Sequence, residues 1–290
     1  MSIVITGATG GLGRLVVESL LSSGVPAGDV VAGGRRLDSI ADLAERGVDV
    51  RRIDYDDPSS LTSGLAGAER VLIVSGTDFG RRPEQHTAVA RAALDAGAEQ
   101  IVYTSAPHAP TTSMQLAADH AATEAALEAL GAPLTVLRNG WYFENYTGQI
   151  PTYLEHGVVL GAAGSGRVSG ADRADYAAAA AAVLTTDGHV GKAYELGGDT
   201  SFDFTELALV VSAATGREVA YSEVAPAELL AVLTGAGVPE PVAGVLVDVD
   251  RAIGDGELLV TTGDLSRLIG RPTGTLTDAV VRAVEELALS

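Results

Sequence analysis

The sequence predicts an α/β fold: a Rossmann-type doubly wound parallel sheet followed by a smaller, mostly helical C-terminal substrate or lid domain. Residues 3–13 read as a β-branched strand, a glycine turn and the start of a helix. Six strand-like segments, this first one included, alternate with helical ones over about 140 residues, which is typical of a parallel sheet covered by helices. After Arg138 this alternation ends. We therefore expect one domain over 1–139 and a lid domain over 140–290 that returns some strands to the first.

The individual elements follow from local patterns. Short apolar runs rich in β-branched residues predict strands, and apolar residues at helical spacing predict helices. After the first strand we expect strands over 29–34, 48–53, 70–74, 100–104, 133–137 and 192–196, and helices over 12–21, 39–46, 61–65, 83–96, 113–130, 172–184 and 203–215. Residues 160–170 are rich in glycine and read as a loop, and the remainder reads as mostly helical.

Composition excludes several classes of protein. With 290 residues, 47% of them hydrophobic, the chain can bury a large core. It has no apolar run long enough to span a membrane and no basic-then-apolar leader, so we expect a cytoplasmic protein without a membrane partner. A formal charge of −19 without a basic stripe argues against a nucleic-acid partner. There is no cysteine, and the five histidines are not spaced as metal ligands, so we expect no metal.

The glycines of the first turn predict a dinucleotide site. Gly7 permits a sharp turn, Gly10 lets backbone N–H groups approach phosphates, and Gly13 lets the helix pack close to the strand. The positive end of the helix dipole then faces the anion. We therefore interpret 1–139 as an NAD(P)-binding domain. The alternative is an ordinary glycine-rich turn between a strand and a helix.

The residues after the second strand predict the choice of cofactor. NAD-binding domains carry Asp or Glu here for the ribose 2′-hydroxyl, whereas this chain has Arg35-Arg36 and no acid before Asp38. A guanidinium can bind a 2′-phosphate through two hydrogen bonds. We expect NADP, with NAD as the alternative if Arg35 only stacks on the adenine. The other arginine pairs, 51–52 and 81–82, read as solvated loop residues.

Several longer motifs resemble those of one family. They are Asp54-Tyr55, Tyr103-Thr104-Ser105, Leu137-Arg138-Asn139-Gly140-Trp141-Tyr142, Glu144-Asn145-Tyr146 and Arg173-Ala174-Asp175-Tyr176. With the glycine turn, they make nearly the whole chain resemble the atypical short-chain dehydrogenases/reductases of the NmrA-like group, in particular its bacterial NADPH:quinone oxidoreductase type 2 and triphenylmethane reductase branch. The resemblance implies an NADP(H)-binding fold with a substrate cleft between two domains. It implies these cofactor-binding positions: Gly7, Thr9, Gly10, Gly11, Leu12, Gly13, Arg35, Asp54, Ser75, Gly76, Thr104, Asn139 and Trp141.

The chain also departs from that family. Typical short-chain dehydrogenases use a Tyr-x-x-x-Lys pair as proton donor, but no tyrosine lies between Thr104 and Trp141, and Lys192 is the only lysine. Reduction of a ketone gives an alkoxide, whose conjugate acid is about as weak as water, whereas reduction of a quinone gives a phenolate-type anion with a pKa near ~10. The missing pair therefore favours a quinone. Gly33 and Gly34 replace the usual aliphatic pair before the arginine, which we expect to loosen the adenine side of the pocket.

Two residues are candidates for catalysis, His120 and Tyr142. His120 lies on the sheet-facing side of its predicted helix, with Glu124 one turn on and able to hold the imidazole. It is either a group with a pKa suited to proton transfer near neutral pH or a buried, satisfied histidine. His86 and His108 read as helix-surface and loop residues. Tyr142 belongs to an aromatic cluster that forms either core or one wall of an apolar substrate cleft.

Together these observations favour an NAD(P)H-dependent oxidoreductase that transfers hydride to a quinone or a similar flat conjugated acceptor. Its expected partner is that small aromatic substrate, and a homodimer is left open. Two alternatives remain. The chain could be a tailoring enzyme, a reductase or an oxygenase-associated one, acting on a polycyclic aromatic natural product. It could also be a non-catalytic, NADP-sensing regulator of the NmrA-like type.

Overall fold

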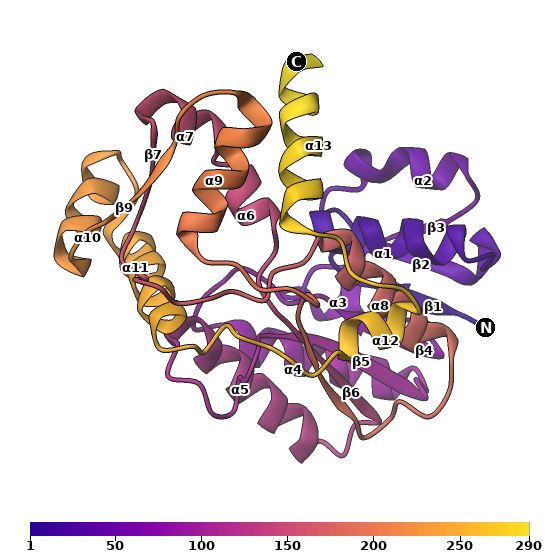
Figure 1. Cartoon of the computed structure of the whole chain (residues 1–290). Helices are drawn as coiled ribbons and strands as arrows, with labels where there is room; N and C mark the ends of the chain where they lie inside the picture. Colours follow the sequence, from indigo (N-terminus) through magenta and orange to yellow (C-terminus); the bar gives the residue numbers. More distant parts are fainter. Residues whose placement is uncertain (290) are drawn as a thin grey trace. The chain divides into compact units, whose positions relative to one another are not determined.

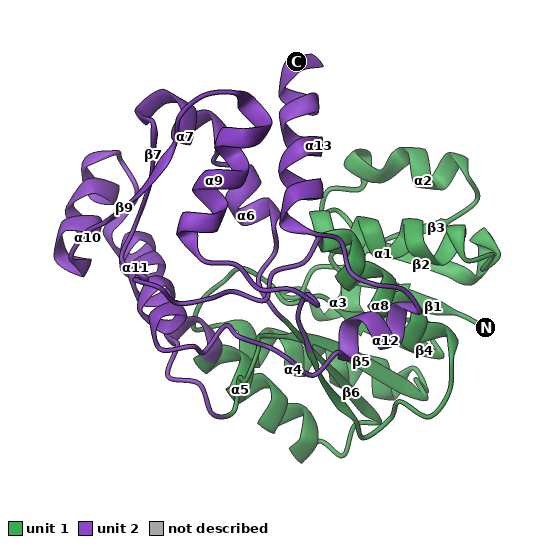
Figure 2. Cartoon of the chain, in the orientation of Figure 1, with its two compact units in different colours: residues 1–110, 118–139, 173–195 green, residues 111–117, 140–172, 196–290 purple. Residues whose placement is uncertain are grey.

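The computed structural model describes residues 1–289, which fall into two compact units (Figure 2). Unit 1 comprises residues 1–110, 118–139 and 173–195, and unit 2 comprises residues 111–117, 140–172 and the chain from Leu196 onward. The expected boundary at 139/140 coincides with one of these limits. Residues 173–195, which the sequence assigns to the second domain, belong to unit 1, and residues 111–117 belong to unit 2.

Unit 1 is built on a seven-stranded sheet with the order β3-β2-β1-β4-β5-β6-β8 (Figure 1). Its strands are β1 (Ile3–Ile5), β2 (Val30–Gly34), β3 (Asp49–Arg52), β4 (Arg70–Ile73), β5 (Gln100–Ser105), β6 (Leu134–Asn139) and β8 (Ala193–Leu196). The pairings from β3 across to β6 are parallel. The predicted Rossmann-type doubly wound sheet is therefore confirmed, and the strand expected over 192–196 forms its last member.

The helices of this unit cover both faces of the sheet (Figure 1). They are α1 (Gly11–Ser22), α2 (Ala41–Glu45), α3 (Pro58–Gly64), α4 (Arg82–Asp95), α5 (Gln115–Ala129) and α8 (Arg173–Thr185), with short 3₁₀ turns at Ala27–Asp29 and Leu37–Ile40. Helix α1 packs against α8, and α3 packs against α4. The residues Val4, Val71 and Ile101 stand side by side in register on β1, β4 and β5. They form one core with Leu61 of α3 and Val89 of α4.

The order of the strands determines where a ligand can bind. From β1 the chain proceeds to β2 and β3 on one side, and from β4 it proceeds to β5 and β6 on the other. The connections that leave β1 and β4 therefore diverge at the carboxyl ends of these neighbouring strands. Such a switch point leaves a crevice at that end of an open parallel sheet.

Unit 2 is mostly helical, as expected, but it also contains a small sheet that the sequence did not predict. Strands β7 (Val158–Gly161) and β9 (Ala220–Glu223) pair in parallel. The glycine-rich loop expected over 160–170 therefore begins inside β7, whose last two residues are Leu160 and Gly161. The helices of unit 2 are α6 (Glu144–Thr147), α7 (Ile150–His156), α9 (Phe204–Thr215), α10 (Pro226–Gly235), α11 (Glu240–Gly254), α12 (Asp264–Ile269) and α13 (Leu276–Leu289).

Among residues 1–289, no helix is both long and apolar enough to cross a membrane.

Candidate functional site: a nucleotide cavity in unit 1

The glycine turn after β1 takes the conformation that its sequence requires. Gly7 has a φ of +63°, in the left-handed region that favours glycine, and its carbonyl accepts a hydrogen bond from the Gly10 N–H at 2.9 Å. Helix α1 begins immediately afterwards, at Gly11. A Cβ at Gly13 would lie 2.5 Å from the carbonyl oxygen of Gly7, so only glycine lets this helix start so close to the turn. The first N–H groups of α1 are thereby brought to the end of β1.

A cavity of about 300 Å³ opens at this end of the sheet. Its lining comes from the turns that follow β1, β2, β3 and β4, as the switch point requires. The lining residues are Gly7, Thr9, Gly10, Gly34, Arg35, Arg36, Ile53, Asp54, Tyr55, Asp56, Val74, Ser75, Gly76, Thr77, Asp78 and Gln85.

Seven of the predicted cofactor-binding residues lie in this lining: Gly7, Thr9, Gly10, Arg35, Asp54, Ser75 and Gly76. Gly11, Leu12 and Gly13 form the first turn of α1 beside it. Thr104 stands behind the lining, where its Oγ1 accepts a hydrogen bond from the Ser75 N–H at 2.9 Å. Asn139 ends β6. Trp141 belongs to unit 2. The binding role of each residue remains a prediction.

Arginines concentrate in a hollow that adjoins the cavity. This hollow measures about 540 Å³ and is lined by Arg35, Arg36, Leu37, Asp38, Ser39 and Arg52. Arg35 and Arg36 line both spaces, so the two lie side by side. Three guanidinium groups and one carboxylate make a site suited to a phosphate group. The sequence predicted Arg35 here, with Arg36 beside it, but it read Arg52 as a solvated loop residue, whereas Arg52 is the last residue of β3.

The expected looseness beside Arg35 is wrong. A Cβ at Gly33 would lie 2.3 Å from Cδ1 of Ile53, and one at Gly34 would lie 2.5 Å from Cγ2 of Thr9. The space that an aliphatic pair would fill is therefore already occupied by the side chains of Ile53 and Thr9. Both of these residues line the cavity, so the two glycines shape its wall rather than enlarge it.

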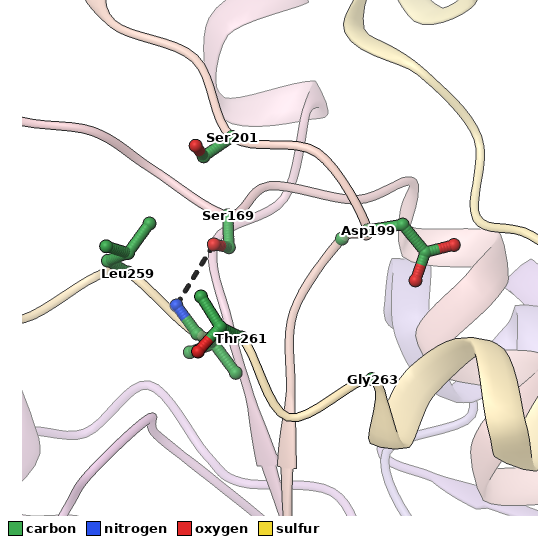
Figure 3. Close-up of a pocket in the computed structure, with 8 residues that line it drawn as sticks. Ser169, Asp199, Ser201, Leu259, Thr261 and Gly263 are labelled. Carbon is green, nitrogen blue, oxygen red and sulfur yellow. Dashed lines mark hydrogen bonds between the residues drawn. The ribbon is translucent and has the colours of Figure 1, made fainter.

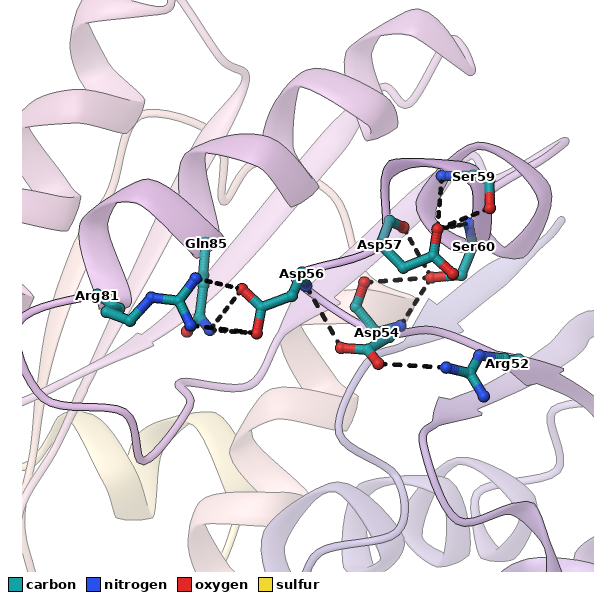
Figure 4. A network of polar contacts seen from close by, with 8 residues as sticks. All are labelled: Arg52, Asp54, Asp56, Asp57, Ser59, Ser60, Arg81 and Gln85. Atoms are coloured by element: carbon teal, nitrogen blue, oxygen red, sulfur yellow. Dashed lines mark hydrogen bonds and ion pairs between the residues drawn. The ribbon is translucent and has the colours of Figure 1, made fainter.

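A network of carboxylates fixes the loop after β3 (Figure 4). Asp54 accepts a hydrogen bond from Arg52 at 3.3 Å, and Asp56 accepts one from Arg81 at 2.7 Å. Asp57 caps α3 by accepting hydrogen bonds from the N–H groups of Ser59 and Ser60. A further bond from the Ser59 hydroxyl, together with these backbone bonds, holds the pKa of Asp57 below its usual value. Gln85 of α4 also donates to Asp56, at 3.2 Å. The loop that presents Asp54 and Tyr55 to the cavity is thus tied to α3 and α4.

Tyr55 connects three strand ends at the base of the cavity. Its hydroxyl hydrogen-bonds Thr6 after β1 and donates to the carbonyl of Val74 after β4 at 2.8 Å. The Val74 N–H in turn donates to Thr6 Oγ1 at 3.1 Å. Burial raises the pKa of Tyr55, so this phenol stays protonated.

His120 faces the sheet, as predicted, but its surroundings differ from the expectation. Its Nδ1 lies 2.8 Å from the hydroxyl of Tyr103, and its Nε2 lies 3.3 Å from Nη1 of Arg82. Burial, followed by the charge of Arg82, lowers the pKa of His120 to about 3. This environment favours the alternative of a buried, satisfied histidine over a group suited to proton transfer near neutral pH. Glu124 does not hold the imidazole, because it accepts hydrogen bonds from Ser105 and Arg138 instead.

Three further expectations about polar residues are corrected or supported. His86 is fully buried rather than on the helix surface. Arg82 is 6% exposed and opens α4, so it is not a solvated loop residue. Both corrections have one cause: the first turns of α4 bury polar side chains, which sequence patterns assign to solvent. His108 does lie in a loop, where its N–H donates to Glu195 at 3.0 Å.

The aromatic cluster in unit 2 divides into core and half-buried residues. Phe143 and Tyr146 are buried against Phe202. Trp141 and Tyr142 are half-buried, and both lie on a segment that pairs with Ala171. The core interpretation thus holds for part of the cluster, whereas a catalytic role of Tyr142 remains a prediction.

Unit 2 contains a second, smaller cavity of about 160 Å³ (Figure 3). Ser169 lies in its wall and accepts a hydrogen bond from the Val260 N–H at 3.0 Å. Its lining is a mixture of small polar and aliphatic residues without an aromatic ring, and its volume is about half that of the nucleotide cavity. In the described part of the chain, no three His, Asp or Glu side chains gather as metal ligands.

Comparisons with known proteins agree with this geometry. Residues 1–283 match the NmrA-like family. Quinone oxidoreductase 2 of Escherichia coli is 45% identical over 278 residues, which cover 96% of this chain and 97% of the relative. The crystal structure of an E. coli NADPH-dependent quinone oxidoreductase with NADPH superposes with a TM-score of 0.94, covering 97% of this chain and 99% of the other at 45% identity. The Citrobacter triphenylmethane reductase with NADP(H) gives a TM-score of 0.91 at 38% identity over 97% of this chain and all of the other. The chain therefore belongs to the NmrA-like family.

Proposed function

We propose that this protein is an NADPH-dependent oxidoreductase that transfers hydride to a quinone or a similar flat conjugated acceptor. The observation that carries the proposal is the pair of adjoining spaces in unit 1, a glycine-turn cavity and an arginine-lined hollow that share Arg35 and Arg36. Its relatives include an NADPH-dependent quinone oxidoreductase and a triphenylmethane reductase. NAD is the alternative cofactor, since an arginine that only stacks on adenine tolerates both.

The residues present fit NADP(H). The turn from Gly7 to Gly13 leaves room where a Cβ would meet backbone, and α1 offers N–H groups at its N-terminus for a pyrophosphate. Arg173 adds a positive charge there, because a Cβ at Gly11 would lie 3.2 Å from its Nη1. Arg35 and Arg36 stand where a 2′-phosphate needs a counter-charge. The bound cofactor would supply a hydride from its nicotinamide ring.

The protein's own part in the reaction is to bind and orient. The Tyr-x-x-x-Lys pair is missing from the sequence, and the buried, neutral imidazole of His120 is poorly placed to supply a proton. An acceptor whose reduced form is a stabilised phenolate needs no strong acid in the site, because its charge is delocalised. We therefore propose a structural role for His120 and keep Tyr142 as the remaining candidate for contact with the acceptor.

A screen of NADPH oxidation with quinones, triphenylmethane dyes and polycyclic ketones tests the proposal. We expect turnover with quinones or dyes and little with simple ketones. A preference for polycyclic ketones would favour the tailoring enzyme, and tight NADPH binding without turnover of any acceptor would favour the regulator. We keep the cytoplasmic location as a prediction, and a homodimer as the assembly to be checked by analytical ultracentrifugation.

A further inference from the structure

Two buried side chains of α4 hold the peptide groups on either side of Gly76, in the wall of the cavity. The Gly76 N–H donates to Nε2 of His86 at 3.0 Å, and the Gly76 carbonyl accepts from Nε of Arg82 at 2.7 Å. His86 is fully buried and Arg82 is 6% exposed. Since both side chains come from adjacent turns of one helix, they act as a single rigid clamp.

The protonation state of His86 is determined by its partners. Nε2 must be unprotonated in order to accept from the Gly76 N–H, which places the ring proton on Nδ1, 3.4 Å from Oγ1 of Thr123. The Thr123 hydroxyl donates onward to the carbonyl of Asp119 at 2.8 Å. Burial and the charge of Arg82 lower the pKa of His86 to about 3, so it remains an acceptor at neutral pH.

Arg82 occupies an unusual position for a buried cation. No carboxylate lies within ion-pair distance of it in residues 1–289. Its partners are the Gly76 carbonyl, Nε2 of His120 and the ring of Phe79, whose centroid lies 4.5 Å from Cζ. The carboxylates of Asp119 and Asp78 act on it only from beyond ion-pair distance. A buried guanidinium without a directly paired carboxylate is costly, and an aliphatic side chain would pack there more favourably. Its strongest bond is the charge-assisted one to Gly76.

The clamp determines where the other ends of these two peptides point. The described chain contains no cis peptide, and the C=O and N–H of a trans peptide point in opposite directions. The Ser75 carbonyl is therefore directed away from His86, and the Thr77 N–H is directed away from Arg82. Within residues 1–289 neither group has a hydrogen-bond partner, and both residues line the cavity.

We infer that His86 and Arg82 are positioning residues for the cofactor, which hold the Ser75 carbonyl and the Thr77 N–H as a ready acceptor and donor pair. This inference rests on the proposed function, since it takes the cavity to be the NADP(H) site. The pair complements a polar edge that carries both a donor and an acceptor, such as an amide or a sugar hydroxyl. Neither Ser75 nor Thr77 lines the arginine hollow, so we expect this acceptor and donor pair to serve NADPH and NADH equally.

Paired substitutions separate this role from general stability. His86→Phe keeps a ring in the core but removes the acceptor, whereas His86→Gln retains an oxygen that can accept from Gly76. Arg82→Met removes the donor, whereas Arg82→Lys keeps one. Val89→Ala, on the same helix and in the apolar core, lowers the melting temperature without touching the clamp.

Calorimetric titration of each variant with NADPH and NADH gives the first readout. We expect His86→Phe and Arg82→Met to raise Kd about tenfold for both cofactors, because a buried polar group loses its partner. His86→Gln and Arg82→Lys should recover most of the affinity, and Val89→Ala should bind like the wild type. The second readout needs no variant: the Thr77 amide resonance of the wild type should shift when NADP⁺ is added.

Several results would overturn the inference. One is a folded His86→Phe variant with unchanged Kd, and another is an equal loss of affinity in Val89→Ala. A Thr77 amide that does not respond to saturating NADP⁺ would also refute it, even if the clamp variants fail to fold. These failures are distinct from that of the proposed function. A wild type that binds NADPH but reduces no quinone or dye refutes the proposed reaction alone.

Discussion

The arginine hollow makes a quantitative prediction about the choice of cofactor. Arg35 is exposed and forms no ion pair within residues 1–289, whereas Arg52 is already paired with Asp54 at 3.3 Å. Arg35 is therefore available to a 2′-phosphate. A hydrogen bond to a charged group contributes about 1.5–3 kcal/mol, and solvent screening at this exposed site favours the lower half of that range. Arg35→Ala should weaken NADPH binding by about 10- to 40-fold.

Titration calorimetry with NADPH and NADH at fixed ionic strength measures this difference. NADH lacks the phosphate, so its Kd should change little. A suitable control is Arg46→Ala, because Arg46 is an exposed arginine paired with Glu18 at 2.7 Å and lies outside both spaces. Higher salt should also weaken NADPH binding more in the wild type than in Arg35→Ala. Equal losses of NADPH and NADH affinity in Arg35→Ala would refute the assignment of the 2′-phosphate to this hollow.

Three further predictions concern the rest of the chain. His120→Ala should lower the free energy of unfolding by about 1–3 kcal/mol, because packing and the hydrogen bond to Tyr103 are lost. The rate of hydride transfer per folded molecule, measured in single turnover, should stay near normal, and its pH dependence should show no histidine ionisation near neutral pH. A loss of rate of about a hundredfold would restore the catalytic interpretation. Burial raises the pKa of Asp250 to about 6, so the folded state binds this proton more tightly than the unfolded state, and stability is lost as the pH rises from about 4 to 6. Asp250→Asn should therefore raise the free energy of unfolding by up to about 3 kcal/mol above pH ~6 and have little effect below pH ~4, and denaturant titrations that show the same gain at both pH values would contradict this. Gly13→Ala should abolish NADPH binding and lower the melting temperature, because its Cβ would lie 2.5 Å from the Gly7 carbonyl oxygen; normal affinity would show that the turn can shift.

The sequence predicted the sheet and the glycine turn because both depend on local patterns. Except for β3, the strands of unit 1 are mostly short apolar runs, and each strand was expected within a few residues of its observed place. Gly7 and Gly13 could be interpreted because a turn and a close helix approach leave few other residues that fit. The strands β7 and β9 were missed for the opposite reason. They are four residues long and lie about 60 residues apart, so neither length nor a nearby partner distinguishes them from loops. Strand β9 is also mostly exposed, and only β7 alternates between half-buried and buried residues.

The electrostatic surroundings of the histidines were beyond prediction from the sequence. The spacing of His120 correctly placed it against the sheet, but its pKa depends on Arg82, which lies 38 positions earlier in the chain. Glu124 lies four residues from His120 and was the natural partner by helical spacing. It forms an ion pair at 2.6 Å with Arg138 of β6 instead, because a guanidinium competes better than an imidazole for a buried carboxylate.

The two helices beside β5 nevertheless contain a pattern that indicates the site. In α4 the buried residues of the first turns are polar, Arg82, Gln85 and His86, whereas those of the later turns are Val89, Ala90 and Ala93. Helix α5 is similar after its first buried residue, Ala117, with buried His120, Thr123 and Glu124 before Leu127. In a parallel sheet, the helix that follows a strand begins at that strand's carboxyl end, where ligands bind. Buried polar side chains are costly unless they hold something in place, and those of α4 hold the loops that line the cavity. A core-facing helix side that changes from polar to apolar along the chain therefore indicates the functional end of such a sheet.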